Sequence, residues 1–283
     1  MRVSIIIPSW NTVALLRQCL LSLETHSAAV PQEIIVVDNA STDDSADMVE
    51  REFPKVRLIR NKKNNGYAGG NDQGAAVARG QYLLLLGSDT EVRAGTLDAL
   101  VAFLDAHPGA GAVTCRLEFP DGRLQPSVKR FPTVLNAIAM YTSLHRFNRR
   151  YLMTDFSHDR LLEVDQPDGT CFMLRRSFFE KHGLFDESLS ILYNDVDLCR
   201  RIKQAGFTIY FLPSVSVMHH GSSSTRQAPP QLRIEMYRNI LTYYERYHGR
   251  TARWLLSPIL CARLLAVTKD ISAPWKLLRK RNA

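Results

Sequence analysis

The 283-residue sequence predicts an α/β protein whose N-terminal half forms a mostly parallel, doubly wound sheet. Short apolar runs, which suit strands buried on both faces, alternate with stretches of helical length. The runs are "VSIII", "EIIVVD", "VRLI" and "QYLLLL". Strands separated by helices of roughly 10–15 residues are typical of a parallel sheet.

The segments between these strands carry helix signals. "ALLRQCLLSLETH" is amphipathic, and "STDDSADMVEREF" opens with Ser41 as the expected N-cap. "GGNDQGAAVARG" is expected to form a helix of small residues that ends at Gly80. A loop with glycines and asparagines, "NNGY", precedes it.

The pattern changes after about residue 115. In "RLEFPDGRLQPS" the pair Asp121-Gly122 is a hairpin signal, whereas residues 134–168 give little local signal. "GTCFMLRRSFFEKHG" predicts a strand and then a helix with Gly183 as its C-cap. "YNDVDLCRRIKQAGF" predicts a helix that ends at Gly206.

The C-terminal part is expected to be helical. "TIYFLPSVSVMHHG" predicts two short strands and "SSSTRQAPP" a loop. From Gln231 onward the pattern is helical, with one break near Pro258 and another at Pro274.

Composition and cysteine usage indicate a soluble or peripheral protein of the cytoplasm. The sequence is 45% hydrophobic and 23% charged, and its five cysteines are widely spread without a C-x-x-C. The start "MRVSIIIPSW" is too short for a signal peptide. The longest apolar stretch, "WLLSPILCARLLAV", is interrupted by Pro258 and Arg263, so we expect no membrane-spanning helix.

The net charge of +8 is concentrated at the C-terminus. Residues 246–283 carry nine Lys or Arg and one acid, so the rest of the chain is neutral. A neutral body argues against nucleic acid as a partner. A basic, partly apolar tail suits an anionic membrane surface, and a solvated terminal helix is the other interpretation.

The loops after the first two strands carry polar groups in place of a dinucleotide fingerprint. The first strand is followed by "PSWNT", Pro8 to Thr12, instead of G-x-G-x-x-G, which argues against a dehydrogenase. That loop offers Asn11 and backbone groups. The second strand ends at Asp38, which can accept hydrogen bonds from a base or a ribose, or can form a turn with Asn39.

Two further segments predict a ligand site at the edge of the sheet. "NNGYAGGNDQGA" contains four glycines and three asparagines, which let backbone N–H groups approach a phosphate or a sugar. The buried strand "LLLL" ends in "GSD", and Asp89 there points into the crevice where α/β sheets bind ligands. On residue type alone, Asp89 could hold a metal, a sugar or only a turn.

Acidic and imidazole groups follow in the second half. Asp195 and Asp197 lie near the start of a helix, whose dipole is expected to keep the pKa of a carboxylate low, as suits a general base. Helix capping by Asn194 and Asp195 is the alternative. Alternation along a strand places His219 and His220 on opposite faces, so one of them could join a carboxylate in binding Mg²⁺ or Mn²⁺, or serve structure alone.

Together these segments resemble a known family. "SIIIPSWN", "IIVVDNASTDDS", "NNGYAGGNDQGAAVARGQYLLLLGSDTEV", "DGRLQPS…RFP", "GTCFMLRRSFFEKHGLFDESL", "YNDVDLCRRIKQAGF" and "MHHGSSS" occur in the order seen in family 2 glycosyltransferases. The resemblance covers roughly residues 3–250 and is strongest to bacterial rhamnosyltransferase-like members that build cell-surface polysaccharide. It implies a Rossmann-like GT-A fold, a mostly parallel central sheet flanked by helices, with a helical C-terminal extension.

The resemblance also implies a role for each matched residue. Asp195 matches the catalytic base, and Asp89 matches the last acid of the D-x-D motif that binds a divalent metal. His219 completes that metal shell, with His220 as the alternative. The implied nucleotide-sugar contacts are Pro8, Asn11, Asp38 (to the nucleobase), Asn65, Tyr67, Gly70, Asn71 and Ser88. The implied acceptor-side or supporting residues are Asn194, Asp197, Arg201 and His220.

The activity implied is an inverting, metal-dependent transfer of one sugar, with Mg²⁺ or Mn²⁺ as cofactor. The donor would be a nucleoside-diphosphate sugar, either dTDP-rhamnose or a UDP-hexose, and the acceptor a lipid-linked or polysaccharide hydroxyl. The Q-x-x-R-W signature of processive members is absent. Gly87 replaces the first D-x-D acid, Asn194 the usual Glu, and Asp72 the usual Asn, so a non-catalytic nucleotide-sugar-binding or scaffold protein is the alternative.

Three regions are expected. Residues 1–115 would bind the nucleotide sugar, residues 116–225 would form the acceptor-binding and catalytic half of the same domain, and residues 226–283 would form the basic helical extension. The expected location is the cytoplasm, peripheral on the inner face of the cell membrane.

Overall fold

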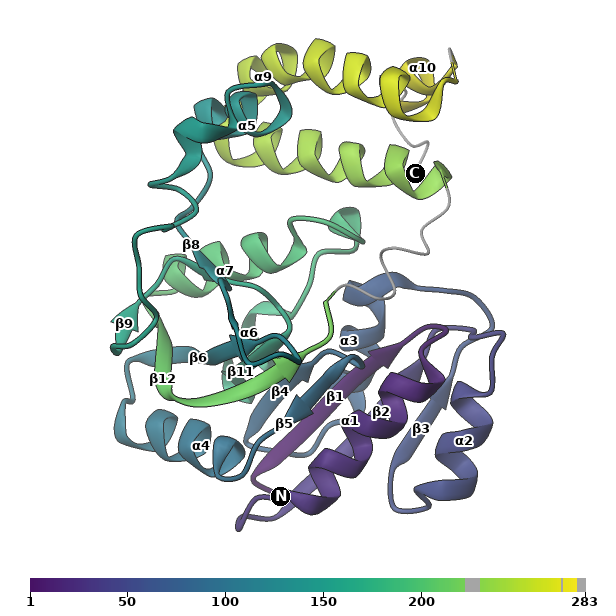
Figure 1. The fold of residues 1–283 in the computed structure, drawn as a ribbon, viewed down its shortest axis with the longest axis vertical. Helices are drawn as coiled ribbons and strands as arrows, with labels where there is room; N and C mark the ends of the chain where they lie inside the picture. Colours follow the sequence, from purple (N-terminus) through teal and green to yellow (C-terminus); the bar gives the residue numbers. More distant parts are fainter. Residues whose placement is uncertain (222–229, 271, 279–283) are drawn as a thin grey trace.

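The computed structural model describes residues 1–221, 230–270 and 272–278 (Figure 1). One ten-stranded sheet contains β1 (Val3–Ser9), β2 (Gln32–Asp38), β3 (Arg57–Arg60), β4 (Tyr82–Leu86), β5 (Thr90–Val92), β6 (Ala110–Glu118), β7 (Leu124–Gln125), β9 (Leu162–Glu163), β11 (Cys171–Arg175) and β12 (Thr208–His219). A separate pair consists of β8 (Val128–Lys129) and β10 (Gln166–Pro167).

The helices are α1 (Val13–Thr25), α2 (Ser45–Glu52), α3 (Gly66–Val77), α4 (Thr96–Ala106), α5 (Val134–Tyr141), α6 (Arg176–His182), α7 (Asn194–Gln204), α9 (Pro230–Thr268) and α10 (Ala273–Leu278). Two 3₁₀ turns are η1 (His145–Asn148) and η2 (Glu187–Leu189). In Figure 1 the sheet with its flanking helices lies below, and α9 with α10 forms a separate helical layer above α7.

The main sheet has the strand order β3-β2-β1-β4-β11-β6-β12-β5. The four predicted N-terminal strands are confirmed and pair in parallel, whereas β11 runs antiparallel between β4 and β6. The predicted α/β fold with a mostly parallel sheet is therefore confirmed, and so is the hairpin at Gly122, where β6 pairs antiparallel with β7.

Two helix boundaries differ from the prediction. Helix α2 begins at Ser45 rather than after Ser41, because Ser41 belongs to a turn: its N–H donates to Asp38 and its Oγ accepts the N–H of Asn11. Helix α3 already begins at Gly66 and ends at Val77, so the expected glycine-rich loop is itself helical. The backbone is extended from Ala78, and the N–H of Gly80 donates to Ser4.

The second half contains one confirmed cap and two corrections. Gly183 follows α6 as predicted, with a φ of 70°. Helix α7 ends at Gln204, slightly before Gly206. The two short strands expected near the end of the domain form one strand, β12, whose pairing with β6 shifts between Leu212 and Ser216. Pro213 lies in this shift, as expected for a residue without an N–H to donate.

The C-terminal helices break at Gly249 instead of Pro258. Gly249 has a φ of 81°, which turns the chain and divides α9 into two helices, whereas Pro258 lies inside the second of them. The break near Pro274 is confirmed, since α10 begins at Ala273 and places Pro274 in its first turn. Most of the segment expected to be a loop, "SSSTRQAPP", lies outside the described residues.

One apolar helix bears on the expectation of no membrane-spanning helix, which stays a prediction. By length and hydropathy alone, one helix among the described residues, Leu232–Thr268, could cross a membrane. The bend at Gly249 divides it, so its second half is the continuous apolar piece.

Hydrophobic residues form three clusters. Val3, Ile5 and Ile7 of β1 contribute to the core on one face of the sheet, and Ile6 contributes to the core on the other face. The third cluster joins α9 and α10 to α5 and to Val196 of α7. Helix α3 packs closely on β1 because Gly70 and Gly74 offer no side chain there.

Gly74→Ala should destabilise the protein through this close contact. A Cβ at residue 74 would lie 2.4 Å from Ile6 Cγ2. A helical Gly-to-Ala change usually gains about 0.5–1 kcal/mol, but overpacking here should cost about 1–3 kcal/mol in the free energy of unfolding. Urea unfolding measures it. Gly109→Ala is the control, since no atom of the described residues lies within 4 Å of the place its methyl group would take. Equal stability of the two variants would contradict this account.

Candidate active site

A carboxylate and an imidazole meet at the end of the central strands. Asp89 lies between β4 and β5, and β5 pairs antiparallel with β12, so that His219 stands opposite Thr90. His219 Nε2 is 3.4 Å from Asp89 Oδ1, and the backbone N–H of His220 donates to the backbone oxygen of Asp89 at 2.9 Å. Both side chains are buried. Strand pairing therefore sets their separation.

The two histidines point in different directions, as alternation predicts. His219 Nδ1 lies 3.0 Å from Oε1 of Gln125. The amide oxygen of Gln125 can accept a hydrogen bond from a protonated Nδ1, and in that tautomer Nε2 has a lone pair on the side of Asp89. His220 Nε2 lies 2.8 Å from Oε1 of Glu91 instead. Sequence reasoning did not single out Gln125 or Glu91.

The chemistry of Asp89 and His219 fits a divalent metal that is shared with a substrate. Carboxylate oxygen and neutral imidazole suit Mg²⁺ or Mn²⁺, and such ions usually complete their shell with substrate phosphate and water. Within the described residues no group of three or more His, Cys, Asp or Glu could hold a metal by itself. A Cβ at Gly87 would lie 3.0 Å from Asp89 Oδ1, so the glycine leaves room for this carboxylate.

Asp195 lies in the first turn of α7. Its Oδ1 accepts the N–H of Val196 at 2.8 Å, and Asn194 Oδ1 accepts the N–H of Asp195 at 2.7 Å. Both bonds reach only the next residue along the chain. The N-cap of α7 is Tyr193, and no side chain of the described residues caps the helix, so the capping expected of Asn194 and Asp195 is not found. These bonds also limit how the carboxylate of Asp195 can rotate.

The expected low pKa of Asp195 is wrong. Burial and the negative charge of Asp168 raise the pKa of Asp195 to about 6, and the charge of Lys129 and the backbone N–H groups offset this only in part. The helix terminus is thus outweighed by desolvation and by a neighbouring acid. A carboxylate with this pKa is mostly ionised at neutral pH and is a stronger base than an exposed aspartate.

A short loop, residues 168–170, links the two acidic centres. Asp168 forms an ion pair with Lys129 beside Asp195. The hydroxyl of Tyr67 donates to the backbone oxygen of Gly169 at 2.6 Å, and the N–H of Gly87 donates to that of Thr170 at 2.9 Å. The loop thus connects the turn before Asp89 with the surroundings of Asp195. Lys129 and Asp168 were missed from the sequence because no local pattern marks them.

Three residues expected to contact the nucleotide sugar lie in or next to α3. Asn71 is fully buried; its Nδ2 donates to the backbone oxygen of Tyr67, while its Oδ1 has no partner among the described residues. Gly70 lies against Pro8, where a Cβ would be 3.0 Å from Pro8 Cβ. Asn65 precedes α3 and makes no side-chain cap. The close approach of α3 to Pro8 is therefore enough to explain a glycine at position 70, without any ligand.

The loops after β1 and β2 brace each other. Asn11 Oδ1 accepts the N–H of Thr42 at 2.8 Å. Asp38 is buried; its Oδ2 accepts the N–H of Ser41, and its Oδ1 has no hydrogen-bond partner among the described residues. Ser88 is also buried, and its hydroxyl lies 3.1 Å from that of Thr12. Asp38 thus forms a turn through Oδ2 and has an unsatisfied acceptor, Oδ1.

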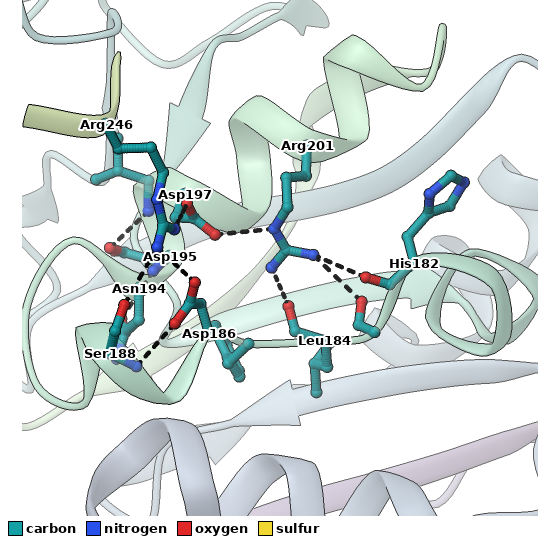
Figure 2. Close-up of polar contacts among 12 residues, drawn as sticks. His182, Leu184, Asp186, Ser188, Asn194, Asp195, Asp197, Arg201 and Arg246 are labelled. Atoms are coloured by element: carbon teal, nitrogen blue, oxygen red, sulfur yellow. Dashed lines mark hydrogen bonds and ion pairs between the residues drawn. The ribbon is translucent and has the colours of Figure 1, made fainter. Parts of the chain in front are cut away.

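Asp197 has a different position from Asp195. Its side chain is fully buried, and it accepts hydrogen bonds from Arg201 and Arg246, both at 2.8 Å, and from the hydroxyl of Tyr247 at 2.7 Å. Figure 2 shows the two arginines converging on this carboxylate. All three of these hydrogen bonds come from the protein itself, which favours the supporting role expected of Asp197 over contact with a sugar acceptor.

We call Asp197 with Arg201, Arg246 and Tyr247 the Asp197 clamp. The two arginines also contact other segments. Arg201 also donates to the backbone oxygens of His182, Gly183 and Leu184 (Figure 2). Arg246 also donates to Asp186 at 2.6 Å. In the same loop the N–H of Phe185 donates to Asp72. Helices α7, α9 and the segment after α6 are therefore held together beside Asp195, and Asp72 is engaged by this loop.

The fold and the paired acidic centres define a glycosyltransferase of the GT-A fold. The chain belongs to glycosyl transferase family 2, whose model matches residues 4–183, well over half of its length. It falls in the rhamnosyltransferase-like group. It is 30% identical over 231 residues to the N-acetylglucosaminyl-diphospho-decaprenol L-rhamnosyltransferase of Mycobacterium tuberculosis, covering 74% of this chain and 72% of that protein. It is also 30% identical over 234 residues to the O-antigen biosynthesis protein RfbC of Myxococcus xanthus, covering 80% of this chain and 18% of that protein.

Solved structures confirm the fold. A mannosyltransferase from Pyrobaculum calidifontis, in complex with GDP-Man and Mn²⁺, aligns with a TM-score of 0.60 at 20% identity over 98% of this chain and 72% of that one. Staphylococcus aureus TarS in complex with UDP-GlcNAc aligns with a TM-score of 0.58 at 19% identity over 96% and 75%. At these identities the likeness concerns the fold alone.

Asp197→Asn should destabilise the protein strongly. The amide keeps the shape but removes the charge that two guanidinium groups and a hydroxyl share, which should lower the free energy of unfolding by about 3 kcal/mol. Urea unfolding followed by circular dichroism measures the loss. Asp155→Asn is the matched control, because Asp155 and its partner Arg149 are 76% and 71% exposed and the change should cost less than about 1 kcal/mol. Similar losses in both variants would exclude the clamp.

Proposed function

We propose that the protein is an inverting, metal-dependent and non-processive glycosyltransferase. It would move one sugar from a nucleoside-diphosphate sugar, dTDP-rhamnose or a UDP-hexose, to a hydroxyl of a lipid-linked or polysaccharide acceptor in cell-surface glycan synthesis. The observation that carries the proposal is the connection of the Asp89–His219 pair to Asp195 through loop 168–170. The mycobacterial relative, whose name describes a rhamnosyl transfer to a diphospho-decaprenol acceptor, supports the substrate class.

Two buried acceptors support the binding of a nucleotide sugar. Asp38 Oδ1 and Asn71 Oδ1 lack hydrogen-bond partners within the described residues. An unsatisfied buried acceptor costs roughly 1–3 kcal/mol, and a ligand that donates a hydrogen bond would remove this cost. The imide N–H of uracil or thymine suits Asp38, and a sugar hydroxyl suits Asn71. Both pyrimidine nucleotides satisfy Asp38 equally.

Asp89 and His219 would hold Mg²⁺ or Mn²⁺. When bound there, the ion would supply positive charge that neutralises the departing nucleoside diphosphate. Gln125 would contribute by accepting a hydrogen bond from Nδ1 of His219, which would leave Nε2 for the metal, and Gly87 by leaving room for the carboxylate of Asp89. The choice of His219 over His220 rests on the contact of His220 with Glu91.

Asp195 would act as the general base. It would take the proton from the acceptor hydroxyl while that oxygen attacks the anomeric carbon from the face opposite the leaving group, which inverts the configuration. Burial and the charge of Asp168 raise the pKa of Asp195, which makes it a stronger base, and the charge of Lys129 lowers it, which favours ionisation at neutral pH. No covalent intermediate is needed.

The remaining expectations form part of the same proposal. Residues 1–115 would bind the donor, residues 116–225 the acceptor, and the extension at 226–283 would place the enzyme on the inner face of the cell membrane. Pro8, Asn11, Asn65, Tyr67, Gly70 and Ser88 would line the donor site or support it.

Asp195→Asn should lower kcat/KM by about 10²- to 10⁴-fold, because a general base is lost. In the parent enzyme kcat/KM should fall as the pH drops below about 6, since protonation removes the base. The pH profile with a radiolabelled donor measures both effects. The variant should unfold at an equal or higher urea concentration, because it no longer buries a charge. A variant that keeps full activity would exclude Asp195 as the base.

Asp168→Asn provides the matching control for the pH profile. Removing the acid that raises the pKa of Asp195 should move the acid limb to lower pH, while Asp195 itself stays in place. An unchanged limb in this variant would assign the titration to another group.

Metal-dependent nucleotide binding tests the site at Asp89. UDP or dTDP with Mn²⁺ should raise the stability of the parent protein, by about 2.7 kcal/mol at 100 times Kd, and chelation should reverse much of this gain. Asp89→Ala should abolish the metal-dependent part in a thermal-shift titration. Glu91→Gln, an acid in the adjoining strand that pairs with His220, should keep it. Binding without any turnover would favour the scaffold alternative.

A further inference from the structure

An apolar hollow on the described surface lies far along the chain from the proposed catalytic residues. It has a volume of about 750 Å³ and is formed by the second half of α9 together with α10. We call it the Trp254–Trp275 groove. Its lining is almost entirely apolar and includes Trp254, Leu255, Pro258, Cys261, Trp275 and Leu278.

The helix that forms this groove is apolar on two faces. Ala252, Leu256, Leu260 and Leu264 recur every four residues and are buried in the cluster with α5 and the first half of α9. On the outer side Trp254 is 75% and Trp275 of α10 is 76% exposed, and Leu255, Leu265, Val267 and Leu278 are exposed as well. A helix on a water-facing surface normally has a polar outer stripe, so this outer face is unusual.

Basic residues accompany the exposed apolar side chains. Arg250 and Arg263 in the second half of α9 are exposed, and so is Lys269, which directly follows the helix. The segment 246–283 carries nine Lys or Arg and one acid. Tryptophan, leucine and basic side chains in one exposed segment are the combination that favours the boundary between anionic headgroups and acyl chains.

We propose that the Trp254–Trp275 groove docks on the surface of a bilayer that contains anionic lipids, with both tryptophans entering the headgroup region. A second copy of this chain is disfavoured as the occupant, because docking groove to groove would bring together two strongly basic segments. A spanning arrangement is disfavoured too, since Leu256, Leu260 and Leu264 would have to leave the cluster that buries them.

The docked surface is mechanically connected to the catalytic half. The first half of α9 is fixed to α7 by Arg246 and Tyr247, which both contact Asp197, and the second half packs on the first. A bilayer that holds the groove would therefore also fix the height of Asp195 above the membrane. This use for a lipid-linked acceptor rests on the proposed function, whereas binding to lipid does not.

Vesicle co-sedimentation of the full chain tests the docking. The vesicles contain phosphatidylcholine alone, or phosphatidylcholine with phosphatidylglycerol, at low and at high salt. We expect binding to the anionic vesicles that weakens with salt, and brominated lipids should quench the tryptophan fluorescence. Trp254→Glu combined with Trp275→Glu should weaken binding at least about tenfold and remove the quenching.

Leu21→Glu is the matched control. Leu21 is an exposed apolar residue of α1 (48% exposed), in the layer of the molecule away from α9 and α10 (Figure 1), and its replacement should leave vesicle binding unchanged. Circular dichroism and metal-dependent UDP or dTDP binding check that the tryptophan variant is folded.

The outcomes separate docking from catalysis. Unchanged sedimentation of the tryptophan variant, or no binding of the parent protein to anionic vesicles, would overturn the docking proposal while leaving the transferase proposal intact. Concentration-dependent dimers in light scattering that the tryptophan variant lacks, together with no vesicle binding, would assign the groove to a second copy. Vesicle binding without any sugar transfer would overturn the transferase proposal alone.

Discussion

The arrangement of this molecule depends on one buried carboxylate. Asp197 is fully enclosed and would be costly to bury without partners, yet it receives hydrogen bonds from Arg201, Arg246 and Tyr247. These donors come from α7 itself and from α9, and Arg201 reaches on to the segment after α6. Three elements that are distant in sequence are thus locked around the first turn of α7. Asp195 lies in that turn, so the clamp determines where the proposed base can stand.

A second constraint, strand pairing, controls the other half of the site. The short strand β5 follows β4 in the chain but lies at the end of the sheet, where it pairs with the end of β12. This pairing brings His219 next to Asp89, which is far from it in the sequence. The two halves meet at loop 168–170, whose backbone receives hydrogen bonds from Tyr67 and Gly87. The site therefore needs few charged residues of its own, because backbone contacts set most of its geometry.

Features set by neighbouring residues could be predicted from the sequence, whereas features set by contacts between distant segments could not. The strands β1 to β4 and the residue types at Asp89 and Asp195 are marked by local pattern, and the opposite directions of His219 and His220 follow from strand alternation. The pKa of Asp195 is not a local property. Lys129 and Asp168 come near Asp195 only because β8 pairs with β10. This pairing places Lys129 opposite Gln166, and no spacing in the sequence shows it.

The C-terminal extension shows the same limit for a helix. The sequence favours Pro258 as the break, because a proline removes a donor and crowds the preceding turn, but the chain turns at Gly249, whose φ of 81° is readily adopted only by glycine. The turn folds α9 back on itself, so the second half buries one apolar face against the first and leaves another exposed. The charge count alone is compatible with a solvated basic tail. Because of the bend, the segment also presents an exposed apolar surface beside its basic residues. Since the first half of α9 is held by Asp197, contacts through α9 connect that surface to the helix turn that carries the proposed base.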